Sequence, residues 1–212
     1  MTKGIFISLE GGDGAGKSTQ MNNIEKYFNE RGYSCVRTRE PGGTSIGEKL
    51  REILLDPENS GMESVTEMMI YAAARAQIVR EFIRPALERG EVVICDRFVD
   101  SSIAYQTYGR ELGDMVKIVN SYAVDGLMPD ITFWMDINPE AGRERIGTRE
   151  DSTLDRLERE KMDFHYRVYD GYRSLCEAEP DRVKRIDATR TIEEMKDEIY
   201  GYLDELCTRI HR

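Results

Sequence analysis

The sequence predicts an α/β fold, in which a doubly wound, five-stranded parallel sheet carries helices on both faces. Three observations lead to this prediction. Short apolar runs typical of buried strands alternate with longer segments whose apolar residues recur at helical spacing. The chain has 212 residues, 40% of them hydrophobic, which suits one full core and a single domain over residues 1–212. A glycine-rich loop follows the first strand-like run, at the sheet edge where ligands bind.

Five short apolar runs are expected to form the strands, and their alternation with helices implies that they run parallel. These runs cover residues 5–9, 34–36, 92–95, 131–137 and 183–186.

The helices are expected between these strands. Met21, Ile24 and Phe28 fall on one face of the first helix, which Gly32 can end. Ser64 is the expected N-cap of a long helix with a proline near its end. The other helices are expected over about residues 46–54, 101–108, 114–124, 153–178 and 192–208, with one more beginning near residue 139.

Charge and composition argue against several classes of protein. The formal net charge of −10 disfavours non-specific binding to nucleic acid, so a small anionic substrate would need arginines gathered locally. We expect no membrane association, since no run reaches the roughly 18 apolar residues of a membrane span and no signal peptide is visible. The four cysteines lack zinc or redox spacing, and Cys35 and Cys95, which lie inside apolar runs, are expected to be buried thiols, which suits the cytoplasm.

The glycine-rich loop matches the phosphate-binding pattern G-x-x-x-x-G-K-[ST], with a strand before it and a helix after it. Glycines allow backbone N–H groups to wrap phosphate oxygens, and the helix N-terminus adds a positive dipole. Lys17 would reach the β- and γ-phosphates of ATP, and the Ser18 hydroxyl would bind Mg²⁺. The alternative is a glycine-rich turn that binds nothing. The expected ATP-binding residues of the loop are Gly11, Gly12, Asp13, Gly14, Ala15, Gly16, Lys17, Ser18 and Thr19.

Asp96 ends the third strand, where a phosphate-binding-loop protein carries the carboxylate that orients Mg²⁺. A helix cap or a simple ion pair with Arg97 is the structural alternative. Arg39 stands just beyond the second strand, and Arg97 directly follows Asp96. Two arginines facing one cleft can clamp an acceptor phosphate, although a single arginine is more often part of a structural salt bridge.

Tyr71 and Arg75 are four residues apart in the long helix, so their side chains share a face. A ring that stacks on a base and a guanidinium that donates to a base carbonyl would form a nucleobase pocket. The alternative is a core tyrosine beside a surface arginine.

Several segments together resemble the thymidylate kinase family, and the similarity covers essentially the whole chain. They are the phosphate-binding loop with Asp13 at its third position and the sequences of residues 38–44, 71–77, 96–98, 101–102 and 104–106, followed by residues 154–158 and 186–188. This resemblance implies transfer of the γ-phosphoryl group of Mg·ATP to dTMP, giving ADP and dTDP, and a nucleoside monophosphate kinase type of fold. It also implies a homodimer formed by helices near the third strand.

The resemblance also implies roles for individual residues of the acceptor site. Tyr71, where many members have Phe, would stack on thymine, and Arg75 would bond its O4. Ser102 would lie near N3, Tyr105 against the sugar with Gln106 beside it, and Asp13 would bond the 3′-hydroxyl, although Asp13 and Ser102 could also be simple caps.

A segment that mixes arginines with acids, residues 143–156, is expected to form a lid over ATP. Some family members carry a catalytic arginine in the phosphate-binding loop and others carry it in the lid. The loop here has no arginine, so the resemblance indicates the lid, with Arg149 as the charge stabiliser and Arg145 stacked on adenine. Spacing alone does not separate the roles of Arg145, Arg149 and Arg156. A solvated charged loop is the alternative.

Two other functions stay open at the level of sequence. One is a kinase for another monophosphate or a deoxynucleoside, and the other is a nucleotide-binding switch or scaffold. A purine would need more room than the pocket of Tyr71, Arg75 and Ser102 offers. Catalytically competent residues, Lys17 and Arg97 among them, argue against a scaffold. The base-reading N-K-x-D motif of GTPases is absent from the sequence.

Overall fold

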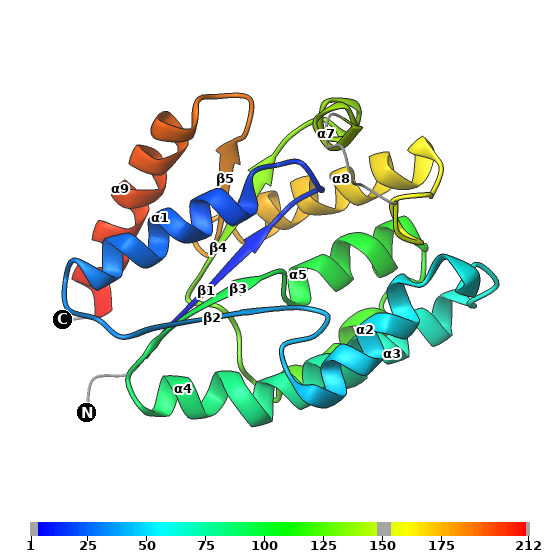
Figure 1. Cartoon of the computed structure of the whole chain (residues 1–212), viewed down its shortest axis with the longest axis horizontal. Coiled ribbons are helices and arrows are strands. Elements are labelled where there is room, and N and C mark those ends of the chain that lie inside the picture. The colour runs from blue at the N-terminus through cyan, green and yellow to red at the C-terminus, as the bar shows by residue number, and fades with distance from the viewer. Residues whose placement is uncertain (1–3, 148–153, 211–212) are drawn as a thin grey trace.

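The computed structural model describes residues 4–147 and 154–210. Its centre is a five-stranded, all-parallel sheet with strand order β2-β3-β1-β4-β5 (Figure 1). The predicted fold class is confirmed, and each strand overlaps the run predicted for it. The strands are β1 (Ile5–Glu10), β2 (Cys35–Arg39), β3 (Val92–Asp96), β4 (Ile131–Asp136) and β5 (Val183–Asp187).

The two faces of the sheet are covered by different helices because alternate residues of each strand point to opposite sides. Ile7 and Leu9 of β1 pack into a core with α1 (Lys17–Asn29) and α9 (Ile192–Ile210), which lie side by side in Figure 1. Phe6 points to the other face, into a second core with residues of α3 and α4.

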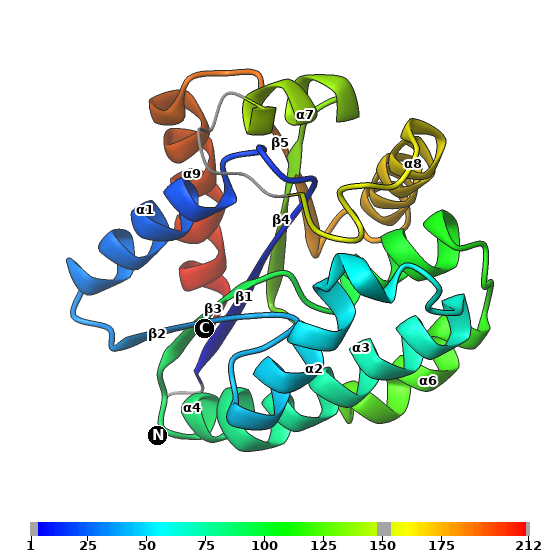
Figure 2. The same cartoon turned by 45° about the vertical axis from the view of Figure 1, so that its right-hand side comes forward.

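The second face carries several helices in series. The long predicted helix consists of α3 (Ser64–Ile78), a π-helical segment (Val79–Ile83) and α4 (Arg84–Glu88). After β3, α5 (Val99–Ser102) continues as a second π-helical segment (Ile103–Gly109), which packs on α8 (Met162–Ala178). Figure 2 shows α2 (Ser45–Leu55), α3 and α6 (Met115–Val124) side by side. Shorter elements are a 3₁₀ turn (Pro57–Asn59) and α7 (Pro139–Gly147).

Two details of the predicted helices are wrong. The helix expected over residues 153–178 begins only at Met162, because side chains close a local turn before it. Asp155 accepts from the backbone N–H groups of Leu157 and Glu158, at 2.8 and 2.9 Å, and Glu158 accepts from Asp155 N at 2.7 Å. Ser64 is already the first residue of α3, and its N-cap position belongs to Glu63, which makes no side-chain cap.

The carboxyl ends of three strands meet at one edge of the sheet. Asp96 at the end of β3 is paired in register with Leu9 of β1 on one side and Arg39 of β2 on the other. The phosphate-binding loop starts two residues after Leu9. The predicted functional residues from three separate segments are therefore brought to one edge of the sheet.

Candidate active site

The loop between β1 and α1 has a backbone that glycine alone adopts easily. Gly11, Gly14 and Gly16 have φ angles of 125°, 79° and 89°. A Cβ on Gly14 would also stand 2.5 Å from the carbonyl oxygen of Gly142 in α7. Gly14 is thus required both by conformation and by the close approach of α7.

Lys17 is buried at the start of α1 and reaches back across the loop. Its Nζ donates to the carbonyls of Gly11 and Gly12, each at 3.0 Å, and lies 3.6 Å from an Asp13 carboxylate oxygen. Burial and the nearby positive charge of Arg97 lower the pKa of Lys17. The ammonium group is therefore held in the loop by groups of the loop itself.

The residues next to Lys17 suit a magnesium ion bound together with phosphates. Ser18 and Asp96 line the same cleft as Lys17. The Oδ1 atom of Asp96 is buried and has no hydrogen-bond partner within the described residues. Over residues 4–147 and 154–210 no cluster of three or more acidic, His or Cys side chains could hold a metal. One carboxylate and a hydroxyl suffice for Mg²⁺, since substrate phosphates and waters supply its other ligands.

Arg97 follows Asp96 in a left-handed conformation, with φ of 68°. Its Nη2 is 2.9 Å from Asp13 Oδ1, while Nη1 donates to the hydroxyls of Ser101 and Tyr172 at 3.4 and 3.3 Å. The guanidinium also lies 5.3 Å from the Tyr105 ring centroid. Burial alone would raise the pKa of Asp13, but Arg97 and Lys17 hold it well below its usual range.

Two further arginines border the same cleft. Arg39 is exposed at the end of β2, and its Nη2 pairs with Glu48 at 2.8 Å. Arg51 of α2 donates from Nη1 to the Pro41 carbonyl at 2.9 Å. Burial and Arg39 lower the pKa of Arg51. Sequence analysis missed Arg51, because nothing in the pattern of α2 distinguishes it from a surface arginine.

Arg75 is only 1% exposed, and each part of its guanidinium has a partner. Glu40 accepts from Nε at 2.7 Å and lies 2.6 Å from Nη2. Ser102 accepts at 2.8 Å, the Phe98 carbonyl accepts at 3.0 Å, and Asn120 accepts as well. The alternative of a helix-surface arginine is therefore wrong.

Arg75 forms part of a second pocket, beside the phosphate-binding cleft. Seven of the eight residues predicted for the acceptor line it, namely Asp13, Tyr71, Arg75, Arg97, Ser102, Tyr105 and Gln106. The eighth, Arg39, lines the phosphate-binding cleft instead. Gln106 is fixed by donating to Glu67 at 2.9 Å. Four residues line both this acceptor pocket and the phosphate-binding cleft, namely Asp13, Glu40, Arg51 and Arg97. The two spaces are therefore neighbours with a common wall.

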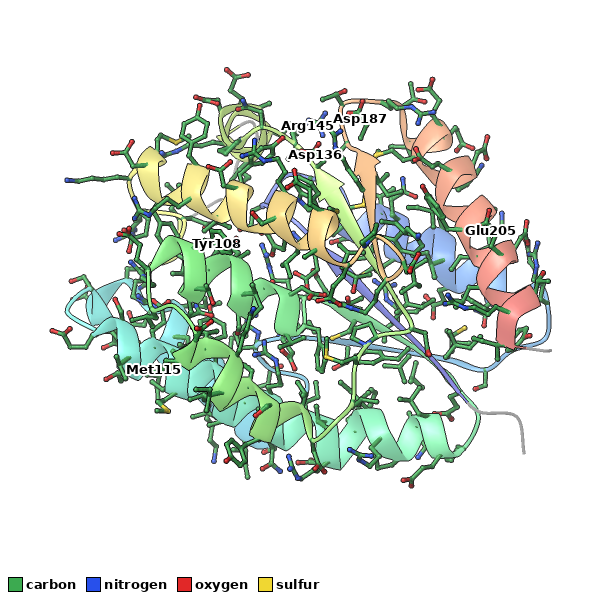
Figure 3. The ribbon with its side chains drawn as sticks, turned by 180° about the vertical axis from the view of Figure 1, so that it is seen from behind. Tyr108, Met115, Asp136, Arg145, Asp187 and Glu205 are labelled. Atoms are coloured by element: carbon green, nitrogen blue, oxygen red, sulfur yellow. The ribbon has the colours of Figure 1, made fainter. Side chains whose placement is uncertain are left out.

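The lid arginines are held very differently from one another. Arg145 of α7 is exposed and donates to the carbonyls of Gly14, at 3.5 Å, and Ala188, at 3.1 Å. Figure 3 shows it at the ends of β4 and β5, beside Asp136 and Asp187. Arg149 lies outside the described residues.

Arg156, in contrast, is buried away from the phosphate-binding cleft. It donates to the Leu54 carbonyl at 2.7 Å and pairs with Glu67 at 2.8 Å. Its position joins the end of the lid segment to α2 and α3.

Three buried carboxylates near the site were not predicted, namely Glu10, Glu40 and Glu67. Burial raises the pKa of Glu40 to about 7, while Arg75 opposes that rise. Glu10 could have been noticed as a charge inside an apolar strand, and Glu40 as the acid beside Arg39. Neither signal shows which distant residue the carboxylate contacts in the fold.

Comparison with known proteins identifies the family of the chain. The family model described as thymidylate kinase matches residues 9–199. The chain belongs to the thymidylate kinase family. A thymidylate kinase of Halothermothrix orenii is 51% identical over 200 residues, covering 93% of this chain and 95% of that protein. One from an Exiguobacterium species is 48% identical over 203 residues, covering 95% of each chain.

A solved structure supports the same assignment. The crystal structure of thymidylate kinase from Ehrlichia chaffeensis superposes with a TM-score of 0.78 at 32% sequence identity, covering 95% of this chain and 99% of that one. As a member of the thymidylate kinase family, the chain is a phosphotransferase. None of the helices in the described part of the chain has the length and apolar character needed to cross a membrane.

Proposed function

We propose that the two joined spaces transfer the γ-phosphoryl group of Mg·ATP to dTMP, giving ADP and dTDP. ATP-dependent phosphorylation of dTMP is the reaction of the family to which the chain belongs. The observation that carries the proposal is the common wall of the acceptor pocket and the phosphate-binding cleft. An acceptor phosphate bound at this boundary would lie next to the γ-phosphate of the donor.

The donor side binds the phosphates of ATP with residues 11–19. Backbone N–H groups of the loop surround the phosphate oxygens, and Lys17 neutralises the charge that develops during transfer. Ser18 and Asp96 would hold Mg²⁺, which would supply charge neutralisation to the phosphates when bound. Arg145 stacks on adenine, supported by its contacts beside the end of β5. Arg149 is the proposed charge stabiliser from the lid.

The acceptor side clamps the phosphate of dTMP between Arg39 and Arg97. Two guanidinium groups give bidentate bonds that orient the acceptor oxygen in line with the γ-phosphate. No strong base is needed, because positioning and charge neutralisation carry this reaction. Asp13 accepts from the 3′-hydroxyl of the sugar.

The base of dTMP fits the other end of the acceptor pocket. Tyr71 stacks on thymine. All five N–H donors of Arg75 already have partners, so Arg75 donates to thymine O4 only in exchange for one of its present hydrogen bonds. Ser102 lies near N3, while Tyr105 and Gln106 border the sugar. This support comes from their common lining of one pocket.

The experiment is an ADP-release assay with Mg·ATP and a panel of dTMP, dUMP, UMP, CMP, AMP and GMP. Strong preference for dTMP is the expected result. Preference for another monophosphate would keep the kinase and overturn the roles of Tyr71 and Arg75. Tight ATP binding without transfer to any member of the panel would favour a nucleotide-binding switch instead.

We propose a homodimer formed through the layer of α2, α3 and α6. Large apolar side chains are exposed on these helices, most of all Ile118 at 61% and Tyr122 at 77%. Others on the same layer are Ile46, Ile53, Val65, Met69 and Met115, the last labelled in Figure 3. Sedimentation should give twice the chain mass of 24.4 kDa, and Ile118→Lys should reduce it toward one chain. A wild-type mass near 24.4 kDa would overturn the proposal.

The proposed location is the cytoplasm. All four cysteines are free, and Cys95 is fully buried. Free thiols persist in a reducing compartment. Fractionation of expressing cells tests this directly.

A further inference from the structure

Glu10 is a fully buried carboxylate, 0% exposed, at the last position of β1. It accepts three hydrogen bonds, from the backbone N–H of Phe98 at 2.7 Å, the Ser101 hydroxyl at 2.6 Å and the Tyr172 hydroxyl at 2.9 Å. No guanidinium or ammonium group of the described residues pairs with it directly. Burial of such a charge destabilises the fold unless hydrogen bonds stabilise the charged form.

The first of these bonds fixes the turn that carries Arg97. Arg97 N donates to the Leu9 carbonyl at 2.9 Å, and the next N–H along the chain, that of Phe98, donates to Glu10. Together they pin both sides of a residue whose φ of 68° is unfavourable for a side chain with a Cβ. The end of β1 therefore determines the backbone conformation of Arg97.

The other two bonds orient the Arg97 guanidinium. Each hydroxyl has one hydrogen, and both Ser101 and Tyr172 can give theirs to the ionised Glu10. Their lone pairs are then directed to Arg97 Nη1, at 3.4 and 3.3 Å. A neutral side chain in place of Glu10 would turn at least one hydroxyl away from this arrangement.

We infer that Glu10 is a positioning residue, which holds Arg97 in the orientation that binds the acceptor phosphate. This inference rests on the proposed role of Arg97 as a ligand of that phosphate. Glu10 itself touches neither nucleotide, since it acts through Ser101, Tyr172 and the Phe98 amide. Glu10 also ties the donor loop, which begins at the next residue, to the acceptor phosphate site.

The test compares the binding of dTMP with that of thymidine, which lacks the phosphate, by calorimetry at pH 8. Glu10→Gln keeps the shape of the side chain and removes its charge. We expect the Kd of dTMP to rise roughly tenfold to a hundredfold, and the Kd of thymidine to change less than about twofold. Equal weakening of both ligands, or an unchanged Kd of dTMP, would overturn the inference.

Two further variants keep this test decisive. Arg97→Ala should abolish the preference for dTMP over thymidine. If it does not, the proposed role of Arg97 fails, whereas failure of Glu10→Gln alone removes only the positioning role. Asp100→Asn is the matched control, because Asp100 is equally buried but pairs with Arg182. It should leave the dTMP preference unchanged even if it lowers stability.

Deleting the two hydroxyls one at a time gives an answer even if Glu10→Gln unfolds, and a double-mutant cycle extends it where Glu10→Gln folds. Tyr172→Phe and Ser101→Ala each delete one hydroxyl between Glu10 and Arg97. Each should raise the Kd of dTMP and leave the Kd of thymidine unchanged. The effects of Tyr172→Phe and Glu10→Gln on the binding of dTMP should be less than additive. Strict additivity, or no effect of either hydroxyl deletion, would overturn the inference.

Discussion

Arg75 and Arg145 both lie beside the nucleotide-binding spaces, and the protein holds them in opposite ways. Arg75 is buried, and Glu40, Ser102, Asn120 and a backbone carbonyl fix its whole guanidinium. Arg145 is exposed on α7 and reaches two carbonyls, one of them in the phosphate-binding loop. One arginine is part of the core, and the other is part of the surface.

On the proposed roles of these two arginines, this difference indicates that the acceptor pocket is built before any nucleotide binds, whereas the adenine side is completed by ATP itself. A preorganised pocket loses little entropy on binding and discriminates between bases through groups that cannot relax. An exposed arginine costs nothing in stability and contributes only to binding. Substitutions on the two sides should therefore have different signatures.

The largest effect is expected for Lys17, which belongs to the preorganised part on the donor side. Lys17→Ala should lower kcat by about 10³-fold, because a buried cation aimed at the transferring phosphates is lost. Steady-state kinetics measure this. Lys26→Ala, an exposed lysine of the same helix, is the control and should retain full activity. A Lys17→Ala enzyme that kept kcat but raised the KM for ATP would contradict the assignment.

Arg75→Ala should cost both function and stability. Removing Arg75 leaves Glu40 buried without its partner, so the free energy of unfolding should fall by about 3–5 kcal/mol. The KM for dTMP should rise as well, and urea denaturation with kinetics measures the two effects. The double variant with Glu40→Gln should recover part of the stability but not the binding. Arg80→Ala is the control, because Arg80 lies about one turn further along on the helix surface. It should change neither the free energy of unfolding nor the KM for dTMP.

Arg145→Ala should give the reverse signature. We expect the free energy of unfolding to stay within about 0.5 kcal/mol of wild type, since the side chain is exposed. The KM for ATP should rise about tenfold through loss of stacking, with the KM for dTMP unchanged. A large loss of stability would break the contrast between the two sides.

The smallest effect concerns pH. Burial and the charge of Asp100 raise the pKa of Glu10 to about 7, although Ser101 and Arg97 oppose the rise. As the pH falls from 7.5 to 6.5, Glu10 takes up a proton, and the Kd of dTMP should rise about threefold more in wild type than in Glu10→Gln. The comparison with the variant cancels titration of dTMP itself. Charged or titratable groups that face Glu10 are Arg97, Asp100, Tyr172 and Lys17.

Much of the fold follows from local signals in the sequence. Apolar runs such as Ile5 to Leu9 form strands because both faces of a parallel sheet are buried. The order of the strands has no local signal. β3 lies between β1 and β2 in the sheet, and long-range packing alone determines this position. The turn before α8 was mistaken for helix because Asp155 and Glu158 satisfy the backbone locally, a competition that periodicity does not reveal.

The candidate site divides in the same way. Residues at strand ends or in the loop after a strand, such as Asp96, Arg97 and Lys17, could be expected to meet because parallel strands end at one edge. Glu10 and Glu40 could not, because their roles depend on partners 88 and 35 residues away. Tertiary geometry determines which buried polar residues pair with each other. A single sequence shows each residue but not its partner.

The turn at residues 154–158 borders both the acceptor pocket and the phosphate-binding cleft. Asp155 and Leu157 line the acceptor pocket, and Glu158 lines the phosphate-binding cleft. Arg156, between them, is anchored to α2 and α3 by Leu54 and Glu67. A nucleotide that binds in one of these two spaces and shifts the turn therefore changes the lining of the other space. Such linkage is reciprocal, so dTMP should alter the affinity for ATP by the same factor by which ATP alters the affinity for dTMP.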